Sequence, residues 1–266
     1  MSSGAVPPAL RLLRVGALAW LFGWYALLHV LAPLYLTFAQ HMPLEFPDFP
    51  GLFTTPRIAA FCYLAPLGTL GALLRPTAAA MRLVALLFVG CATVMLLHVD
   101  SYNDATFLVG FWLGLWLLWL SGRAARADAE TVEDAAGLLV CIGSFLFLGG
   151  VVGKLHAAWW NGEVIAHVLV DERTYWFFPW VRDHLSAPEQ LHLSRWLARI
   201  GLTFELTAVA SVLLPIRAGL LTLTAASLGV IACAGWTLAS VLGGFVVVAA
   251  YCLRQVGPRP PRGPGA

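Results

Sequence analysis

Lys154 is the only lysine in a chain whose other basic side chains are arginines. It lies near the end of an apolar segment, after Gly149, Gly150 and Gly153. Arginine would serve to pair with a phosphate, whereas a desolvated lysine amine can lose its proton and act as a base. Lys154 is therefore the first candidate for catalysis. The alternative is a lysine that reaches from a helix end to the membrane surface.

Two further ionisable residues lie in apolar surroundings. His156 follows Lys154 by two positions, which on a helix places it about 200° away, so it would face the aromatic segment that comes next. Glu205 lies within a later apolar run, where a lone carboxylate should be paired or protonated. Glu205 then either neutralises Lys154 across a helix bundle as a structural pair or contributes to binding.

A polar cluster spans residues 101–106 and includes Asn103 and Asp104. One interpretation is an external turn with a helix N-cap, because Asn and Asp suit both roles. The other is that the cluster lines the same outer cavity as Lys154, and spacing alone does not separate the two. His29 and His98 lie near the ends of apolar runs, where a backbone carbonyl commonly satisfies a histidine.

The composition indicates where these residues are placed. The chain has 266 residues, of which 60% are hydrophobic and 11% charged, and its mean hydropathy is +0.81. A soluble domain carries about 25% charged residues, whereas a bilayer accepts an apolar exterior. A net charge of +2 gives no indication of nucleic-acid binding. We expect an integral membrane protein.

A membrane-spanning helix needs about 20 mainly apolar residues. The sequence predicts an all-α fold, a polytopic bundle of about eight transmembrane helices. The predicted spans are Val15–Phe38, Ile58–Leu74, Met81–His98, Ala105–Ser121, Ala136–Ala158, Trp196–Pro215, Ala218–Gly235 and Trp236–Leu253. The last two divide one long apolar run near Gly235. The first follows Arg11 and Arg14 like a signal peptide, but it is long and is expected to stay uncleaved.

The arginines predict the orientation, because loops rich in Lys and Arg stay in the cytoplasm. With the N-terminus inside, ten arginines fall on the cytoplasmic side: Arg11, Arg14, Arg75, Arg82, Arg123, Arg126, Arg217, Arg254, Arg259 and Arg262. Eight spans return the C-terminus to the same side. The expected organisation is a cytoplasmic segment 1–14, a membrane domain 15–253 and a disordered cytoplasmic tail 254–266. Residues 122–134 are expected to form a short charged loop.

An aromatic-rich segment, Trp159–Arg195, separates the fifth and sixth predicted spans. It contains Trp159, Trp160 and the run from Tyr175 to Trp180, which includes Trp176. Tryptophan and tyrosine favour the membrane interface. We expect short helices that lie on the outer surface or enter the membrane partway.

Other chemistry finds little support in the sequence. The five cysteines, Cys62, Cys91, Cys141, Cys233 and Cys252, lie in apolar runs without metal-site spacing, so they are expected to be buried hydrophobic residues. No phosphate-binding loop, dinucleotide fingerprint or H-E-x-x-H motif occurs. No metal site is predicted.

Four of these segments together resemble one family. The stretch from Gly153 to Gly162 resembles the K-L-x-x-x-W-x-x-G signature of the vitamin K-dependent gamma-carboxylase family, also called the HTTM family. Residues 175–180 are similar to its aromatic H-W-x-F-x-P-F stretch. Residues 101–110 resemble its S-W-N-N-H-S-Y-L-x-G segment, and residues 204–208 resemble an acidic position in its following helix. The order and spacing of all four agree, over roughly residues 57–253.

The resemblance implies an enzyme that binds reduced vitamin K or a menaquinol-type quinone. Lys154 matches the lysine that serves as base, and the implied binding residues are Asn103, Asp104, His156, Trp159, Trp176 and Glu205. The implied activity couples oxygenation of the quinol to carboxylation of glutamate in a secreted peptide or protein. The chain departs from the family at Ala105, where the family has a histidine. No large extracytoplasmic domain is expected within the 266 residues.

Two functions therefore stay open. The first is a quinol-dependent carboxylase or epoxidase, with its site at the extracytoplasmic ends of the helices. The second is a non-catalytic accessory protein that binds a lipid, a quinone or an immunity-type partner. A transporter is a weaker third option, because few charges are paired within the spans and no repeated broken-helix pattern is present.

Overall fold

The computed structural model describes residues 7–23, 77–96, 105–123, 129–168, 178–234 and 236–256. Within these ranges all regular elements are helices, so the all-α prediction is confirmed. The longer ones are a helix over 8–23, α4 (Ala78–Leu96), α5 (Ala105–Arg123), α6 (Ala129–Gly153), α10 (Ala187–Ala210), α11 (Ile216–Ala234) and α12 (Trp236–Gln255). The shorter ones are α7 (Ala157–Trp160), α8 (Glu163–Val168), α9 (Phe178–His184) and the 3-10 turn η3 (Ser211–Leu213).

Two of the described helical segments are long and apolar enough to cross a membrane. They are Glu130–Gly153 in α6 and Ala187–Leu213, which comprises α10 and η3. Shorter apolar stretches occupy α4, α5, α11 and α12. The count of eight spans stays a prediction, because residues 24–76, which contain Ile58–Leu74 and most of the first predicted span, lie outside the described residues.

The helix boundaries correct two expectations. The expected loop over residues 122–134 is helical from Ala129 onward, and the Asp134 carboxylate pairs with Arg123 at 3.0 Å. In addition, α10 begins at Ala187 rather than at Trp196. A capping box with Ser186 and Glu189 starts this helix. The polar first turns therefore extend α10 beyond the apolar stretch, because capping satisfies the free amides at a helix start.

The two breaks that flank α11 fall near the predicted span boundaries. Leu214 is extended and precedes Pro215, so η3 ends there and α11 begins at Ile216. This conformation is the usual one before proline. The long apolar run divides as expected, since α11 ends at Ala234 and α12 begins at Trp236.

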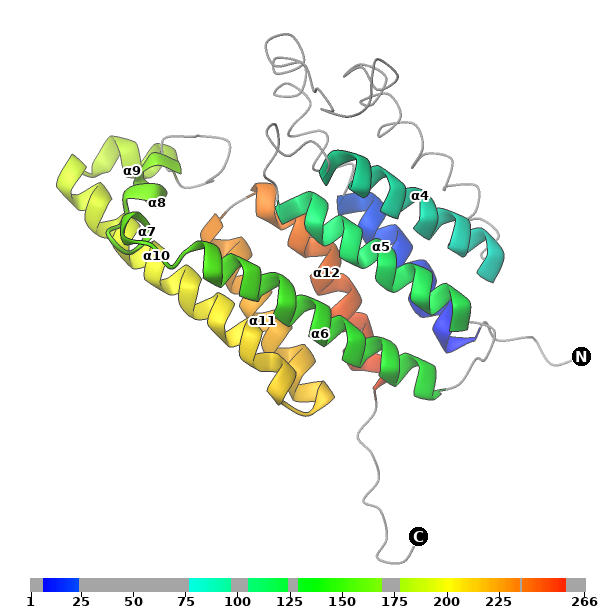
Figure 1. Ribbon diagram of the computed structural model, residues 1–266. Helices are drawn as coiled ribbons and strands as arrows, with labels where there is room; N and C mark the ends of the chain where they lie inside the picture. Colours follow the sequence, from blue (N-terminus) through cyan, green and yellow to red (C-terminus); the bar gives the residue numbers. More distant parts are fainter. Residues whose placement is uncertain are drawn as a thin grey trace, which may run out of the picture.

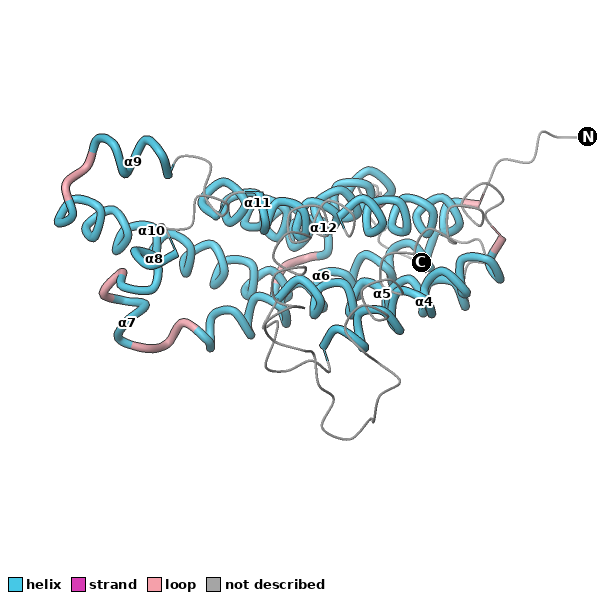
Figure 2. Tube along the Cα trace, turned by 90° about the horizontal axis from the view of Figure 1, so that it is seen from above, coloured by secondary structure: helices cyan, strands magenta, loops and turns pink. Residues whose placement is uncertain are grey.

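The long helices lie side by side, as Figures 1 and 2 show. Small residues let them approach: a Cβ at Gly114 would lie 2.9 Å from Val89, and one at Gly143 would lie 2.7 Å from Leu223. Buried tryptophans bridge neighbouring helices, since Trp116 Nε1 donates to the Ala135 carbonyl at 2.9 Å. Close packing through small residues is typical of helices that associate in lipid.

Several described arginines lie toward one end of the bundle, whereas Arg182, Arg195 and Arg199 lie in α9 and α10 at the other. The side chain of Arg82 lies 3.7 Å from a Cβ built at Gly122, beside Arg123. The helix over 8–23 starts at the same end. Its Gly16 packs on Trp116 of α5, and its Ala19 packs on Gly244 of α12. The helix is therefore antiparallel to both, and its first turn lies at the end where α5 reaches Arg123 and α12 reaches Arg254. The opposite end carries α7, α8 and α9. Together with the first half of α10 they project beyond the end of α6 (Figures 1 and 2).

Candidate functional site

Lys154 and Glu205 form an ion pair at this projecting end of the bundle. The Lys154 Nζ atom donates to Glu205 Oε1 at 2.6 Å. The side chains are 20% and 10% exposed, so both are largely removed from solvent. The structure thus pairs Glu205 with Lys154, as one of the two alternatives expected, and a role of Glu205 in binding stays a prediction. In such surroundings the Coulomb attraction of a pair is much stronger than in water.

Helix α6 positions the lysine by ending just before it. Gly153 is the last residue of α6, and the final turn tightens so that the Lys154 amide donates to the Val151 carbonyl at 3.0 Å. The Lys154 Nζ atom reaches back to the Gly150 carbonyl at 3.3 Å. The carbonyls at a helix C-terminus attract cations. The amine therefore has two oxygen partners, one from each helix.

Trp159 in α7 completes the surroundings of the amine. The Lys154 Nζ atom lies 5.0 Å from the centre of the Trp159 ring. The ring nitrogen donates to the Ala198 carbonyl of α10 at 3.3 Å. A cation over an aromatic face is stabilised by the ring quadrupole, more strongly when desolvated. Of the predicted binding residues, Trp159 and Glu205 thus meet at Lys154.

The second oxygen of the carboxylate has no partner in the described part of the chain. Glu205 Oε2 is buried and has no hydrogen bond among the described residues. It lies against α6 at Gly150, where an added Cβ would be 3.4 Å away from it and 3.3 Å from Oε1. A buried acceptor left unsatisfied costs about 1–3 kcal/mol. The missing side chain of Gly150 leaves room for the carboxylate, because a Cβ there would lie only 3.3 Å from Oε1.

Ser144 fixes the helix pair that holds the site. Its hydroxyl donates to the Ala208 carbonyl at 3.1 Å and lies 3.0 Å from the Ser211 hydroxyl. These contacts join α6 to α10 within two turns of Glu205. They set the alignment of the two antiparallel helices, and hence the Gly150–Glu205 contact, because each helix is rigid over such a length.

His156 does not lie on a continuous helix with Lys154, so the prediction of opposite helix faces is wrong. Its backbone is extended, with φ −141° and ψ 158°, and it is the N-cap of α7. The glycines before Lys154 end α6 early. Within the described part of the chain the exposed His156 side chain makes no hydrogen bond or ion pair, whereas its carbonyl accepts from Trp159 N at 3.1 Å.

Three other predicted residues, Asn103, Asp104 and Trp176, lie outside the described residues. The same holds for His29 and His98. Among the residues that the structure does describe, no group of histidine, cysteine and acidic side chains is placed to hold a metal ion.

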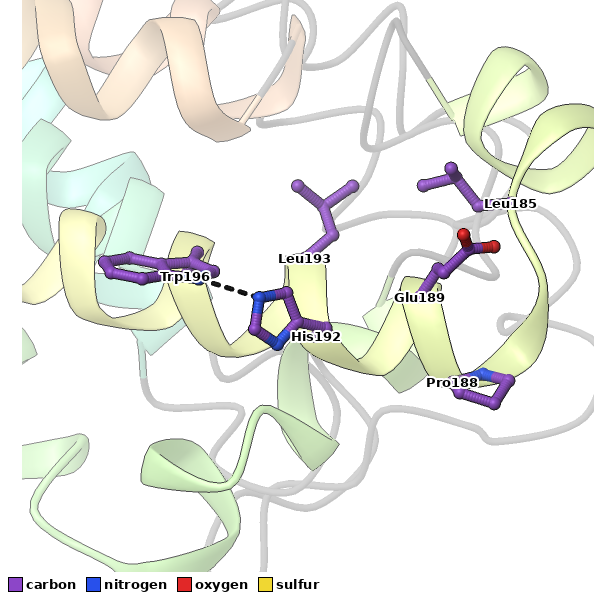
Figure 3. Close-up of a pocket in the computed structure, with 6 residues that line it drawn as sticks. All are labelled: Leu185, Pro188, Glu189, His192, Leu193 and Trp196. Atoms are coloured by element: carbon purple, nitrogen blue, oxygen red, sulfur yellow. Dashed lines mark hydrogen bonds between the residues drawn. The ribbon is translucent and has the colours of Figure 1, made fainter.

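A concave feature lies on the outer part of α10, away from the ion pair. It encloses about 430 Å³ and is drawn in Figure 3. Its lining residues are Leu185, Pro188, Glu189, His192, Leu193 and Trp196. Its polar atoms bond within the chain: Glu189 Oε2 accepts from Ser186 at 2.6 Å, and Trp196 Nε1 donates to His192 Nε2 at 3.1 Å. The Lys154–Glu205 pair is therefore the stronger candidate site.

Sequence reasoning did not identify Gly150 and Ser144 as parts of the site. Gly150 carries a detectable signal, because it precedes Lys154 by four positions and so lies on the same helix face. Ser144 carries none, since its partners are about 64 residues away along the chain.

The chain matches no protein-family model, no curated protein and no solved structure.

Proposed function

We propose that the chain is a multi-pass membrane protein with both termini in the cytoplasm and its site toward the extracytoplasmic side. Two features support this: the long apolar segments of α6 and α10, and the end of the bundle that carries Arg82, Arg123 and Arg254. Positively charged helix ends stay on the cytoplasmic side. Lys154 and Glu205 then lie near the outer ends of the spans.

We further propose that the site binds a reduced quinone, as the resemblance to the vitamin K-dependent gamma-carboxylase family implies. The observation that carries this proposal is the largely buried Lys154–Glu205 pair, 2.6 Å apart, within an otherwise apolar bundle. Ionisable groups inside a membrane are costly and mark functional sites. The unsatisfied Glu205 Oε2 is compatible with a ligand that carries a hydroxyl group.

In this proposal each residue has a separate task. Lys154 acts as a base only after its ammonium has lost a proton, and Glu205 Oε1 is the acceptor within reach. Trp159 covers the amine, and apolar helices would keep water away from it. The reduced quinone would supply, on reaction with oxygen, the base strength needed to carboxylate a glutamate in a secreted peptide or protein.

The test is quinone analysis of the purified protein. Lipids are extracted before and after a menaquinol-type quinol is added in air, and the quinone products are separated by reverse-phase chromatography. We expect epoxide from the wild-type protein and none from Lys154→Ala. Equal epoxide from both proteins would remove Lys154 from the mechanism.

The second candidate is a non-catalytic accessory protein that binds a lipid, a quinone or an immunity-type partner. The fact that favours it is that Lys154 is already neutralised by Glu205 and held by the Gly150 carbonyl, as a structural pair would be. Ala105, where the family has a histidine, favours it too. It predicts a retained lipid or partner and no turnover in the same experiment.

A further inference from the structure

The pocket on the outer part of α10 combines apolar walls with one charged group (Figure 3). Its aliphatic and aromatic walls come from Leu185, Pro188, Leu193 and Trp196. Among the described residues that line it, Glu189 alone is acidic. Such a pocket fits a ligand that is apolar over most of its length and charged at one end.

The Glu189 carboxylate has one oxygen to offer. Both the amide and the hydroxyl of Ser186 donate to Glu189 Oε2, at 2.8 and 2.6 Å. In the described part of the chain Oε1 accepts no hydrogen bond, and no cation pairs with this carboxylate. The charge that would complement the pocket is therefore positive, on a group with N–H donors.

His192 adds a donor one helical turn away. Trp196 Nε1 donates to His192 Nε2 at 3.1 Å, so this nitrogen carries no proton and the neutral ring holds its proton on Nδ1. The Nδ1–H group has no partner among the described residues. His192 follows Glu189 by three positions, and such residues are neighbours on a helix surface. The pocket thus offers an acceptor for a cation beside a donor for an anion, as a zwitterionic head group requires.

The exposed face of α10 continues from the pocket as a largely apolar surface. Trp196, Ile200, Thr203 and Thr207 are exposed and share one face of the helix. The hydroxyls of the two threonines donate to the carbonyls four residues before them, at 2.8 and 2.7 Å, so they need no partner from outside. From Trp196 to Thr207 this surface is about 16 Å long, close to half of the roughly 30 Å hydrocarbon core. One acyl chain of the outer leaflet matches this length.

We infer that the pocket binds the head group of a phospholipid with a primary amine, whose acyl chain lies along α10. This inference rests on the proposed placement in the membrane and is independent of quinone binding. The ammonium donates to Glu189 Oε1, and His192 Nδ1–H donates to the phosphate. An ammonium has three N–H donors, whereas the trimethylated amine of choline has none. The carboxylate therefore distinguishes ethanolamine from choline head groups.

The test compares two phospholipids that differ only at the amine. Purified full-length protein in detergent is titrated with phosphatidylethanolamine and, separately, with phosphatidylcholine of the same acyl chains, and bound lipid is measured by native mass spectrometry. Because the carboxylate is exposed to solvent, we expect about two- to fivefold tighter binding of the ethanolamine lipid. Glu189→Gln preserves the capping box, which accepts either residue, and removes the preference. His192→Phe weakens both lipids alike, since both carry the phosphate.

Glu163→Gln is the matched control, because Glu163 is an exposed carboxylate of α8 that does not line the pocket. It keeps the wild-type ratio. Equal binding of the two lipids by wild-type protein, or a preference that survives Glu189→Gln, overturns the inference and leaves the membrane placement standing. A loss confined to one lipid in His192→Phe contradicts the phosphate contact. Protein that stays monodisperse without detergent and binds neither lipid overturns the membrane placement, and the inference falls with it.

Discussion

At the scale of single residues, the ion pair decides what Lys154 can do. A neutral, desolvated lysine is ready to act as a base, whereas Lys154 has a carboxylate at 2.6 Å. Buried ion pairs contribute little net stability, but a single partner left behind is strongly destabilising. The pair is thus costly to break from either side, and this asymmetry can be measured.

Removing one partner of the pair is expected to destabilise the protein more than removing both. Lys154→Met or Glu205→Leu alone leaves a buried charge and costs about 3–5 kcal/mol. The double variant replaces the pair by apolar side chains and recovers most of this loss. Thermal unfolding in detergent checks the prediction. Additive losses in the double variant would show that the two side chains do not interact.

Gly150 and Gly149 form a matched pair of adjacent positions on α6. A Cβ at Gly150 lies 3.3 Å from Glu205 Oε1, whereas one at Gly149 meets no atom of the described residues within 4 Å. Gly150→Ala is therefore expected to be less stable than Gly149→Ala by about 1–3 kcal/mol, because it crowds the carboxylate. Melting temperatures of both variants decide this, and equal values would mean that the carboxylate adjusts freely.

At the scale of elements, the short helices α7 and α8 pack against α10. The turn between α7 and α8 contains Gly162 with φ 78°, which is a left-handed conformation that favours glycine. The Asn161 carbonyl in the same turn accepts from Arg195 Nε at 3.0 Å. Trp159 is thereby placed beside Lys154 as part of a folded unit. The expectation of short helices in this segment is confirmed by α7, α8 and α9.

Gly162→Ala is expected to detach this turn from α10. The new Cβ would lie 2.6 Å from the Arg195 backbone nitrogen, and the left-handed backbone adds about 1–2 kcal/mol. Limited proteolysis measures the effect as faster cleavage between α7 and α9. Gly201→Ala on α10 is the control, since its Cβ meets no described atom within 4 Å. Unchanged cleavage in both variants would contradict the close packing of the turn.

At the scale of the whole molecule, the bundle has the length of a bilayer. Helix α6 has 25 residues and is thus about 37 Å long, against about 30 Å for the hydrocarbon core. One end carries Arg82, Arg123 and Arg254, and the other carries the ion pair, the tryptophan-rich helices, Arg182 and Arg195. This polarity agrees with the proposed orientation.

The orientation can be tested by labelling from one side of the membrane. In a variant whose native cysteines are replaced, Ser186→Cys precedes α10 at the projecting end, and Gln255→Cys ends α12 at the arginine end. A membrane-impermeant maleimide applied to intact cells is expected to label Ser186→Cys only. Gln255→Cys should react after lysis. The reverse pattern would invert the topology, and labelling of both in intact cells would argue against a spanning bundle.

Much of the fold followed from local features of the sequence. Apolar runs predicted helices, and the predicted boundaries at Pro215 and near Gly235 agree with the observed limits of α11. Proline and glycine disfavour a continuous helix through local backbone effects, which a sequence can reveal. The starts of α6 and α10 were misplaced, since capping and ion pairs such as Arg123–Asp134 extend helices beyond their apolar stretches. Hydropathy reports only the part of a helix that lipid or the core can accept.

The sequence by itself determined that Lys154 and Glu205 are unusual, because an ionisable side chain in an apolar run needs a partner. Only the tertiary structure decided that they are each other's partner, across 51 positions of sequence. It also ended α6 at Gly153, made His156 the exposed N-cap of α7 and left Glu205 Oε2 without a hydrogen bond among the described residues. Helix periodicity is a local property, whereas the contact between α6 and α10 depends on how two distant surfaces pack.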